Sequence, residues 1–228
     1  MDITLHYIEE GTGTPLLLLH GNGEDGTYFK HQLAYFSKKY RVIAVDTRGH
    51  GQSPRGAAPF TISQFAEDLN AFLEQRDISK AVILGFSDGA NIAMRFAMKH
   101  PEKVEALILN GGNLNARGVK ASVQIPIELG YRMTKLFSRI SEKARKNHEM
   151  LALMVDDPNI ELSELKEIHV PTLVIAGTED MIKEEHTKLL AAEIPGAELK
   201  FVKGGHFVAA KASEEFNAAV DLFLERVL

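Results

Sequence analysis

The chain has 228 residues, of which 45% are hydrophobic and 25% are charged, and its formal net charge is −5. This length and composition fit one globular domain with a sizeable core and room for a small insertion. Because acidic residues outnumber basic ones by 31 to 26, we expect no nucleic acid partner, which would need a basic excess.

Segments that would place the protein in a membrane or an oxidising compartment are also not visible. No apolar run approaches the roughly 20 residues that cross a bilayer. The sequence contains no cysteine and shows no basic, apolar secretory signal at Met1. We therefore expect a cytoplasmic protein without a membrane partner.

Six short strand-like runs, of which the first four are continuous apolar runs closed by glycine, predict the strands of a sheet. Continuous apolar runs, rather than alternating ones, are typical of parallel strands that are buried on both faces. The six runs are Leu16–His20, Arg41–Asp46, Ala81–Phe86, Val104–Asn110, Thr172–Gly177 and Glu198–Val202.

Amphipathic segments lie between these runs and predict helices. Thr61 begins a capping box ahead of apolar residues at helical spacing, and Ala90–His100 ends before Pro101, where a helix should stop. Further helices are expected over Lys183–Ile194 and Ser213–Arg226. The alternation of strand and helix predicts an α/β fold with a doubly wound, mostly parallel sheet flanked by helices.

The alternation breaks between residues 113 and 162, where the sequence becomes rich in methionine and basic residues. We expect residues 113–162 to form a helical cap over one edge of the sheet. Residues 1–112 and 163–228 would then form the core domain. An insertion is favoured because about 50 residues exceed what one crossover usually needs. Two plain crossover helices are the alternative.

The sequence Gly85-Phe86-Ser87-Asp88-Gly89 follows a predicted buried strand and precedes a predicted helix. A tight turn at this place lifts the serine hydroxyl above the carboxyl edge of the sheet, at a helix N-terminus that favours developing negative charge. Ser87 is therefore the candidate nucleophile. The alternative is an ordinary serine that caps the helix.

A nucleophilic serine needs a base and a carboxylate that orients the base. His206 follows the last predicted strand in a glycine-flanked loop, whereas the second choice, His186, falls within a predicted helix. Asp180 follows another strand and is the candidate carboxylate, and Glu179 is the alternative. The order of Ser87, Asp180 and His206 along the chain is the one expected for a serine on this kind of turn.

Acyl transfer also needs N–H groups that hold the oxyanion. The N–H of Asp88, directly after the nucleophile, is one candidate. The second is the N–H of Asn22 in the loop Gly21-Asn22-Gly23, with either neighbouring glycine as the alternative. An ordinary tight turn is the other interpretation of this loop.

On these motifs the sequence resembles the α/β-hydrolase fold superfamily, in its branch of small, capped serine hydrolases of the carboxylesterase kind. The matching segments are His20–Gly23, Asp46–Ser53, Gly85–Gly89, Gly177–Asp180 and Gly204–His206. The resemblance implies that the Asp46–Ser53 stretch is structural, and that the usual first edge strand of the sheet is missing. A serine nucleophile disfavours the dehalogenase and epoxide-hydrolase branches, which attack with a carboxylate.

Apolar residues near the sheet edge and on the cap are expected to line a substrate pocket. They are Phe29, Phe86, Leu114, Met133, Phe137 and Phe207. Cap methionines are expected to pack inside the cap, and its basic residues to form a solvated face. We expect no metal or cofactor, because the chain lacks His-Glu-x-x-His, Gly-x-Gly-x-x-Gly and a P-loop lysine.

The leading hypothesis is a cofactor-free serine hydrolase that cleaves carboxylic esters of small or medium size through an acyl-enzyme. One alternative keeps the triad but breaks a carbon–carbon bond, by hydrolysis or in a lyase step. Another is a ligand-binding signalling protein with the same fold and slow turnover. The partner in each case is a small molecule, and the sequence leaves the oligomeric state open.

Overall fold

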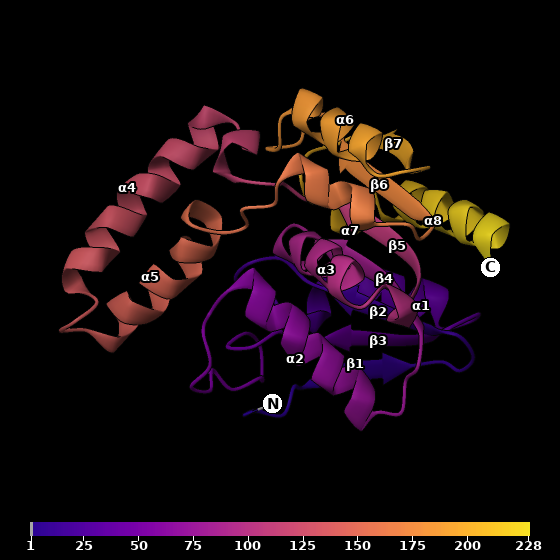
Figure 1. Ribbon diagram of the computed structural model, residues 1–228, viewed down its shortest axis with the longest axis horizontal. Coiled ribbons are helices and arrows are strands. Elements are labelled where there is room, and N and C mark those ends of the chain that lie inside the picture. The colour runs from indigo at the N-terminus through magenta and orange to yellow at the C-terminus, as the bar shows by residue number, and fades with distance from the viewer. Residues whose placement is uncertain (1) are drawn as a thin grey trace.

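The computed structural model describes residues 2–228, and it shows a central sheet with helices on both faces (Figure 1). The strands are β1 (Tyr7–Glu10), β2 (Pro15–Leu19), β3 (Arg41–Val45), β4 (Ala81–Phe86), β5 (Val104–Asn110), β6 (Thr172–Gly177) and β7 (Glu198–Val202). The α-helices are α1 (Lys30–Phe36), α2 (Ile62–Gln75), α3 (Asp88–Lys99), α4 (Ala121–Phe137), α5 (Glu142–Val155), α6 (Glu184–Glu193), α7 (Val208–Lys211) and α8 (Ser213–Val227). Short 3-10 helices are η1 (Gly26–Phe29), η2 (Pro101–Lys103), η3 (Ala116–Gly118) and η4 (Leu162–Glu167).

The strands form one sheet in the order β1-β3-β2-β4-β5-β6-β7. β1 runs antiparallel to β3, and the other neighbours are parallel, so the carboxyl ends of β2 to β7 share one edge. The six predicted strands and the α/β fold class are confirmed. β1 was not predicted, because Tyr7–Glu10 is a partly exposed edge strand with no continuous apolar run.

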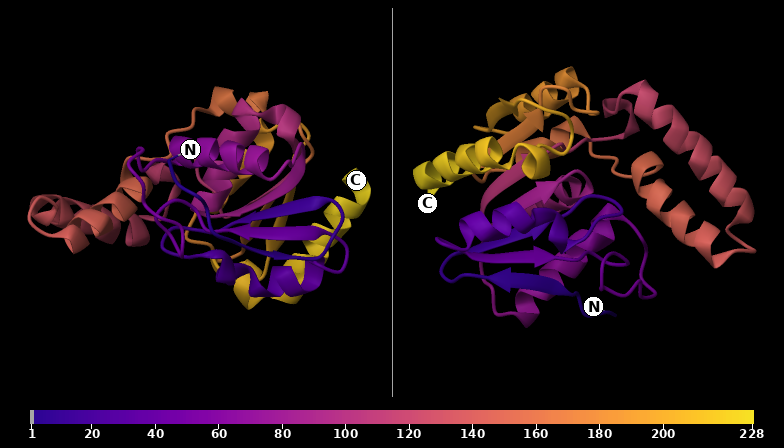
Figure 2. Two further views of the ribbon diagram at one scale, coloured as in Figure 1. Left: turned by 90° about the horizontal axis from the view of Figure 1, so that it is seen from below. Right: turned by 180° about the vertical axis from the view of Figure 1, so that it is seen from behind.

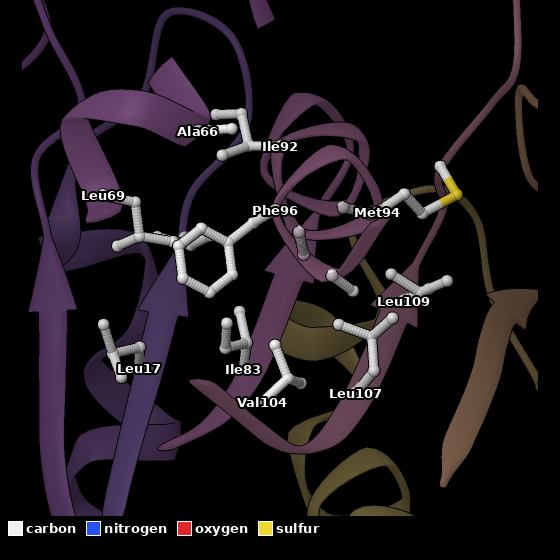
Figure 3. Close-up of a cluster of buried hydrophobic side chains, with 14 of the residues drawn as sticks. Leu17, Ala66, Leu69, Ile83, Ile92, Met94, Phe96, Val104, Leu107 and Leu109 are labelled. Atoms are coloured by element: carbon white, nitrogen blue, oxygen red, sulfur yellow. The ribbon is translucent and has the colours of Figure 1, made fainter. Parts of the chain in front are cut away.

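Each face of the sheet packs against its own helices. Strand residues such as Leu17, Ile83 and Leu107 join α2, α3 and α6 in one core cluster, part of which is drawn in Figure 3. Their neighbours on the opposite face, such as Leu16 and Val82, pack against α1, α7 and α8. Successive residues of these strands point to opposite faces of the sheet, and both faces are covered by helices. The central strands must therefore be apolar at nearly every position.

Helices α4 and α5 form a hairpin within the segment expected to be the cap, and Figure 2 shows it projecting beyond the sheet. α5 is fastened to the body at two places. Nδ2 of Asn22 donates to the carbonyl of Met150 at 2.7 Å, and Arg55 pairs with Glu149 at 2.7 Å. The division into core and cap domains stays a prediction.

Candidate active site

The turn at residues 85–89 holds Ser87 at the carboxyl edge of the sheet. β4 ends and α3 begins on either side of Ser87, which has φ 54° and ψ −119°. A positive φ is uncommon outside glycine and persists only where the surroundings enforce it. The glycines are required because a Cβ on Gly89 would lie 1.9 Å from the carbonyl oxygen of Leu19, and one on Gly85 would lie 2.2 Å from that of Gly89.

The three residues of the expected triad meet at this edge. Nε2 of His206 lies 3.0 Å from Oγ of Ser87, and Nδ1 of His206 lies 2.7 Å from Oδ1 of Asp180. Both His206 and Asp180 are buried, and Oδ1 of Asp180 also accepts the N–H of Ile182 at 2.9 Å. This arrangement can pass a proton from a hydroxyl to an imidazole and stabilise the imidazolium with a carboxylate.

The alternative acid, Glu179, and the alternative base, His186, lie outside this series of hydrogen bonds. Glu179 is exposed, although it directly precedes the buried Asp180. His186 accepts the N–H of Leu114 on its Nε2 at 3.0 Å, and burial lowers the pKa of its imidazole. The His186 ring therefore positions the segment that leads to α4. Because its Nε2 already accepts the N–H of Leu114, it is not available as a base for Ser87.

The loop after β2 lies against the candidate nucleophile. A Cβ on Gly21 would lie 3.1 Å from Cβ of Ser87. The N–H of Glu24 donates to the carbonyl of Gly21 at 3.3 Å, which closes a turn that contains Asn22. The N–H of Asp88 belongs to the first turn of α3, where N–H groups have no intrahelical acceptor. Both expected donors thus come from segments beside Ser87, and their role in an oxyanion hole stays a prediction.

The side chain of Asp88 is buried with little hydrogen bonding. Nδ2 of Asn91 lies 3.5 Å from Oδ1, and Oδ2 has no hydrogen-bond partner among residues 2–228. Burial raises the pKa of the Asp88 carboxyl to about 7; the charge of Asp157 raises it further, and hydrogen bonds from Asn22 and Asn91 oppose the rise. This carboxyl therefore titrates near neutral pH, one residue from the candidate nucleophile.

Two of the six residues expected in the pocket form an aromatic wall beside the triad. The ring of Phe86 lies 4.8 Å from that of His206, and the ring of Phe207 lies 5.6 Å from both. Phe207 is 42% exposed, so it offers apolar surface to a ligand, whereas Phe86 is only 1% exposed and supports the wall from the core.

The other four are not brought to this wall. Phe29 is wholly buried among the core residues on the α1 and α8 face, and Leu114 is buried in the opposite cluster. Met133 and Phe137 lie on the projecting hairpin and are more than half exposed, so Met133 does not pack inside a cap as expected. The reason is that α4 extends away from the body instead of folding over the sheet edge (Figures 1 and 2).

Two polar residues that the sequence did not single out also face this region. The ring of Tyr28 stacks on Phe86 with centroids 4.5 Å apart and planes at 8°, and its buried hydroxyl has no partner within residues 2–228. Burial raises the pKa of the Glu24 carboxyl to about 6, and the charge of His206 opposes the rise. Both follow the glycine loop after β2, which is the only signal the sequence offers for them.

The Asp46–Ser53 stretch serves as scaffold. Oδ1 of Asp46 accepts the N–H of Gly26 at 2.7 Å, and Oδ2 accepts that of Gln52 at 2.9 Å. The guanidinium of Arg48 is fully buried and binds the carboxylate of Asp68 at 2.7 Å. These contacts hold the loops after β2 and β3 together.

Across residues 2–228, no group of three or more His, Asp or Glu side chains is placed to hold a metal ion. No helix in the same range has the length and apolar character needed to cross a bilayer.

Comparison with known proteins places these features in a family. A family model described as the alpha/beta hydrolase fold matches residues 14–128. An uncharacterized protein of Mycobacterium tuberculosis is 35% identical over 119 residues, which are 52% of this chain and 34% of that protein. The chain therefore spans about a third of the length of this relative.

Other similarities extend over nearly the whole chain. A 3-oxoadipate enol-lactonase of Acinetobacter baylyi is 24% identical over 99% of this chain and 94% of its own. A solved structure of an N-acyl homoserine lactone degrading enzyme is 27% identical, covers 97% of both chains and has a TM-score of 0.80. Similarity of this extent includes the strands that carry Ser87, Asp180 and His206.

Proposed function

The chain belongs to the alpha/beta hydrolase fold family, and from this premise we propose that it is a serine hydrolase that cleaves carboxylic esters through an acyl-enzyme. One observation carries the proposal. Ser87, His206 and Asp180 form a continuous hydrogen-bonded series with distances of 3.0 Å and 2.7 Å. Such a series is the arrangement that activates a hydroxyl for attack on a carbonyl.

In the first half of the reaction, Oγ of Ser87 attacks the ester carbonyl while Nε2 of His206 takes the hydroxyl proton. The negative charge that develops on the carbonyl oxygen is held by the N–H groups of Asp88 and Asn22. The imidazolium of His206 is stabilised by Asp180. It then gives its proton to the departing alkoxide. The alcohol leaves, and the acyl group remains bonded to Ser87.

In the second half, His206 takes a proton from a water molecule that attacks the acyl carbon. The same two N–H groups hold the second oxyanion. Ser87 then leaves with the proton from His206, and the carboxylic acid is released. Every proton moves between Ser87, His206, water and the leaving group, so the cycle needs no cofactor.

The substrate is proposed to be a carboxylic ester of small or medium size, with lactones included. The exposed ring of Phe207, which packs against the buried Phe86, suits an acyl chain better than a charged group. The names of two relatives support an ester, because a lactone is a cyclic ester: one is an enol-lactonase and the other degrades an N-acyl homoserine lactone.

Labelling with a fluorophosphonate probe tests the nucleophile. The protein should be labelled once, and Ser87→Ala should abolish labelling, whereas labelling that persists in this variant contradicts the assignment. A panel of p-nitrophenyl esters, a γ-lactone and a small diketone then tests the bond. Cleavage of the diketone without ester hydrolysis would favour the carbon–carbon alternative. One burst of acylation without turnover would favour the slow-turnover ligand-binding protein.

A further inference from the structure

The hairpin of α4 and α5 carries an apolar surface that the proposed function does not use. Six large apolar side chains of this hairpin are more than half exposed, from 52% for Phe137 to 82% for Ile140. The six are Ile125, Leu129, Met133, Leu136, Phe137 and Ile140. A helix that leaves this much apolar surface in water is expected to have a partner for it. We call these six residues the hairpin stripe.

The hairpin stripe occupies one side of α4. Ile125, Leu129, Met133 and Leu136 recur at intervals of four, four and three residues, which places them on one face of a helix. The face that packs on α5 is a different one. On that face, Tyr131 stacks on His148 with ring centroids 4.5 Å apart. Most of the stripe is thus separate from the contact between the helices; Met133 and Phe137, at its margin, line a hollow shared with Ala144 and Asn147 of α5.

The hairpin is also the most basic part of the chain. The hairpin, residues 121–155, holds six basic residues and three acidic ones, a net charge of +3, whereas the whole chain has −5 and the remainder therefore −8. The six, all exposed, are Arg132, Lys135, Arg139, Lys143, Arg145 and Lys146. Within the described range, Arg132, Lys135 and Arg139 form no ion pair. Positive charge thus adjoins the stripe, and Glu128, one helical turn before Arg132, is the acidic side chain of α4 that offsets part of it.

We propose that the hairpin docks on an anionic lipid surface, with the stripe entering the boundary between headgroups and acyl chains. Apolar side chains beside a basic row are the features by which a helix binds an anionic membrane surface. The rest of the chain, with a net charge of −8, is repelled by the same surface. The protein would therefore contact the lipid surface with the hairpin first. The hairpin projects from the body, as such a contact requires (Figure 2).

A second copy of the chain fits the stripe less well. A two-fold contact of stripe on stripe would bring Arg132, Lys135 and Arg139 of both copies close together, and like charges would oppose it. The body offers no broad apolar acceptor among residues 2–228. Leu199 and Leu222 share one hollow between β7 and α8, which charged residues such as Glu198 and Arg226 also line. The other exposed large apolar side chains, such as Tyr35, Leu162 and Leu189, lie on separate elements.

The expectation of no membrane partner was based on the absence of a spanning segment. Docking on a surface needs no such segment, because only one face of a helix enters the lipid. The proposal therefore departs from the expectation of no membrane partner.

Co-sedimentation with lipid vesicles tests the proposal. The protein should bind vesicles that contain phosphatidylglycerol at least about tenfold more tightly than pure phosphatidylcholine. Leu129→Ser with Leu136→Ser should lower binding about tenfold, as should Arg132→Glu with Arg139→Glu. The matched controls lie on the body: Leu222→Ser is an exposed leucine of α8, and Lys38→Glu with Lys200→Glu reverses two exposed lysines. Equal binding to both kinds of vesicle, or an equal loss in the controls, overturns the proposal.

Tryptophan fluorescence gives a second measurement, because the chain contains no tryptophan. Emission from Leu136→Trp should shift to the blue on anionic vesicles and be quenched by lipids brominated on the acyl chain. Leu222→Trp should show neither effect. Light scattering tests whether a second copy of the chain covers the stripe instead. If the wild type is a dimer that does not bind vesicles, and Leu129→Ser with Leu136→Ser dissociates this dimer, the stripe is assigned to a second copy. Ser87→Ala should bind vesicles normally, so this result is independent of the proposed reaction.

Discussion

Nδ1 of His206 lies 2.7 Å from Oδ1 of Asp180, and the two side chains are only 6% and 3% exposed. Water therefore has little access to this hydrogen bond, and the carboxylate can fix which ring nitrogen carries the proton. The neighbouring carboxylate, Glu179, is exposed and takes no part. The distinction between two adjacent acids can be measured.

Asp180→Asn is expected to lower kcat on an ester substrate by a factor on the order of 10⁴, because the amide favours the wrong tautomer of the imidazole. Glu179→Gln should change kcat by less than about tenfold, since an exposed carboxylate is screened by water. Steady-state kinetics on one p-nitrophenyl ester compares the two. If the larger loss belongs to Glu179→Gln, the acid has been assigned to the wrong residue.

The carboxyl of Asp88 should make stability depend on pH. Its pKa is raised from the ordinary 3.8 to about 7 in the folded protein. Between these values the unfolded chain has released the proton and the folded chain retains it, so the free energy of unfolding falls as pH rises. The slope for one group is at most about 1.4 kcal/mol per pH unit.

Asp88→Asn removes this titration and should gain stability relative to the wild type from about pH 4 to pH 7. Urea unfolding at several pH values measures the difference. Glu102→Gln, at an exposed carboxylate without an ion pair among the described residues, is the control and should show no trend. A constant difference between Asp88→Asn and the wild type over this range would contradict the raised pKa.

The same group should affect catalysis. Ionised Asp88 places a negative charge one residue from Ser87, where the oxyanion must be stabilised. We expect kcat/KM of the wild type to fall above about pH 7, the value to which burial raises the pKa of Asp88. Asp88→Asn keeps the backbone N–H and should lose this fall. An identical alkaline limb in both proteins would assign the decline to another group.

The sequence predicted the features that depend on local pattern and on sheet geometry. β2 to β6 were predictable because strands buried on both faces are apolar, as Leu16–Leu19 are. β7 is a mostly exposed edge strand that contains Glu198 and Lys200, and it was predicted from the resumed alternation of strand and helix. The meeting of Ser87, Asp180 and His206 followed because parallel strands share one carboxyl edge. The glycines around Ser87 added the tight turn.

Features that depend on how a surface is covered were not predictable. The periodicity of Leu129 and Met133 indicates an apolar face, but it does not show whether another element covers it; among residues 2–228 both side chains stay more than half exposed. Phe29 follows the glycine loop closely in sequence, yet the short η1 helix turns its ring into the core. Tyr28, its neighbour, stacks on Phe86 instead.

Arg48 and Asp68 form the most deeply buried ion pair described, with exposures of 0% and 2%. Arg48→Met should lower the free energy of unfolding by about 3–5 kcal/mol, because it leaves Asp68 buried without its partner. Lys39→Met breaks an ion pair with Asp221 whose lysine is 49% exposed, and should cost less than about 1 kcal/mol. Urea unfolding at pH 7 measures both. Similar losses in the two variants would mean that Arg48 is solvated more than its burial indicates.

The exposed ring of Phe207 beside the triad predicts that substrate selection at the site is apolar. Contact with an apolar wall is not weakened by salt, whereas steering by surface charge is. We therefore expect kcat/KM on a soluble, neutral butyrate ester to change little between low and moderate ionic strength. Phe207→Ala should raise KM several-fold for the butyrate and less for the acetate, because the longer chain loses more contact.

Charge on the hairpin should matter little to this soluble substrate. Arg132→Glu with Arg139→Glu should leave kcat/KM on the neutral ester within about twofold, because a neutral molecule is not steered by charge. A fall of tenfold or more with added salt, or with this double variant, would show that charge selects the substrate. The basic hairpin would then serve the active site itself, and Phe207→Ala would be expected to have little effect on KM.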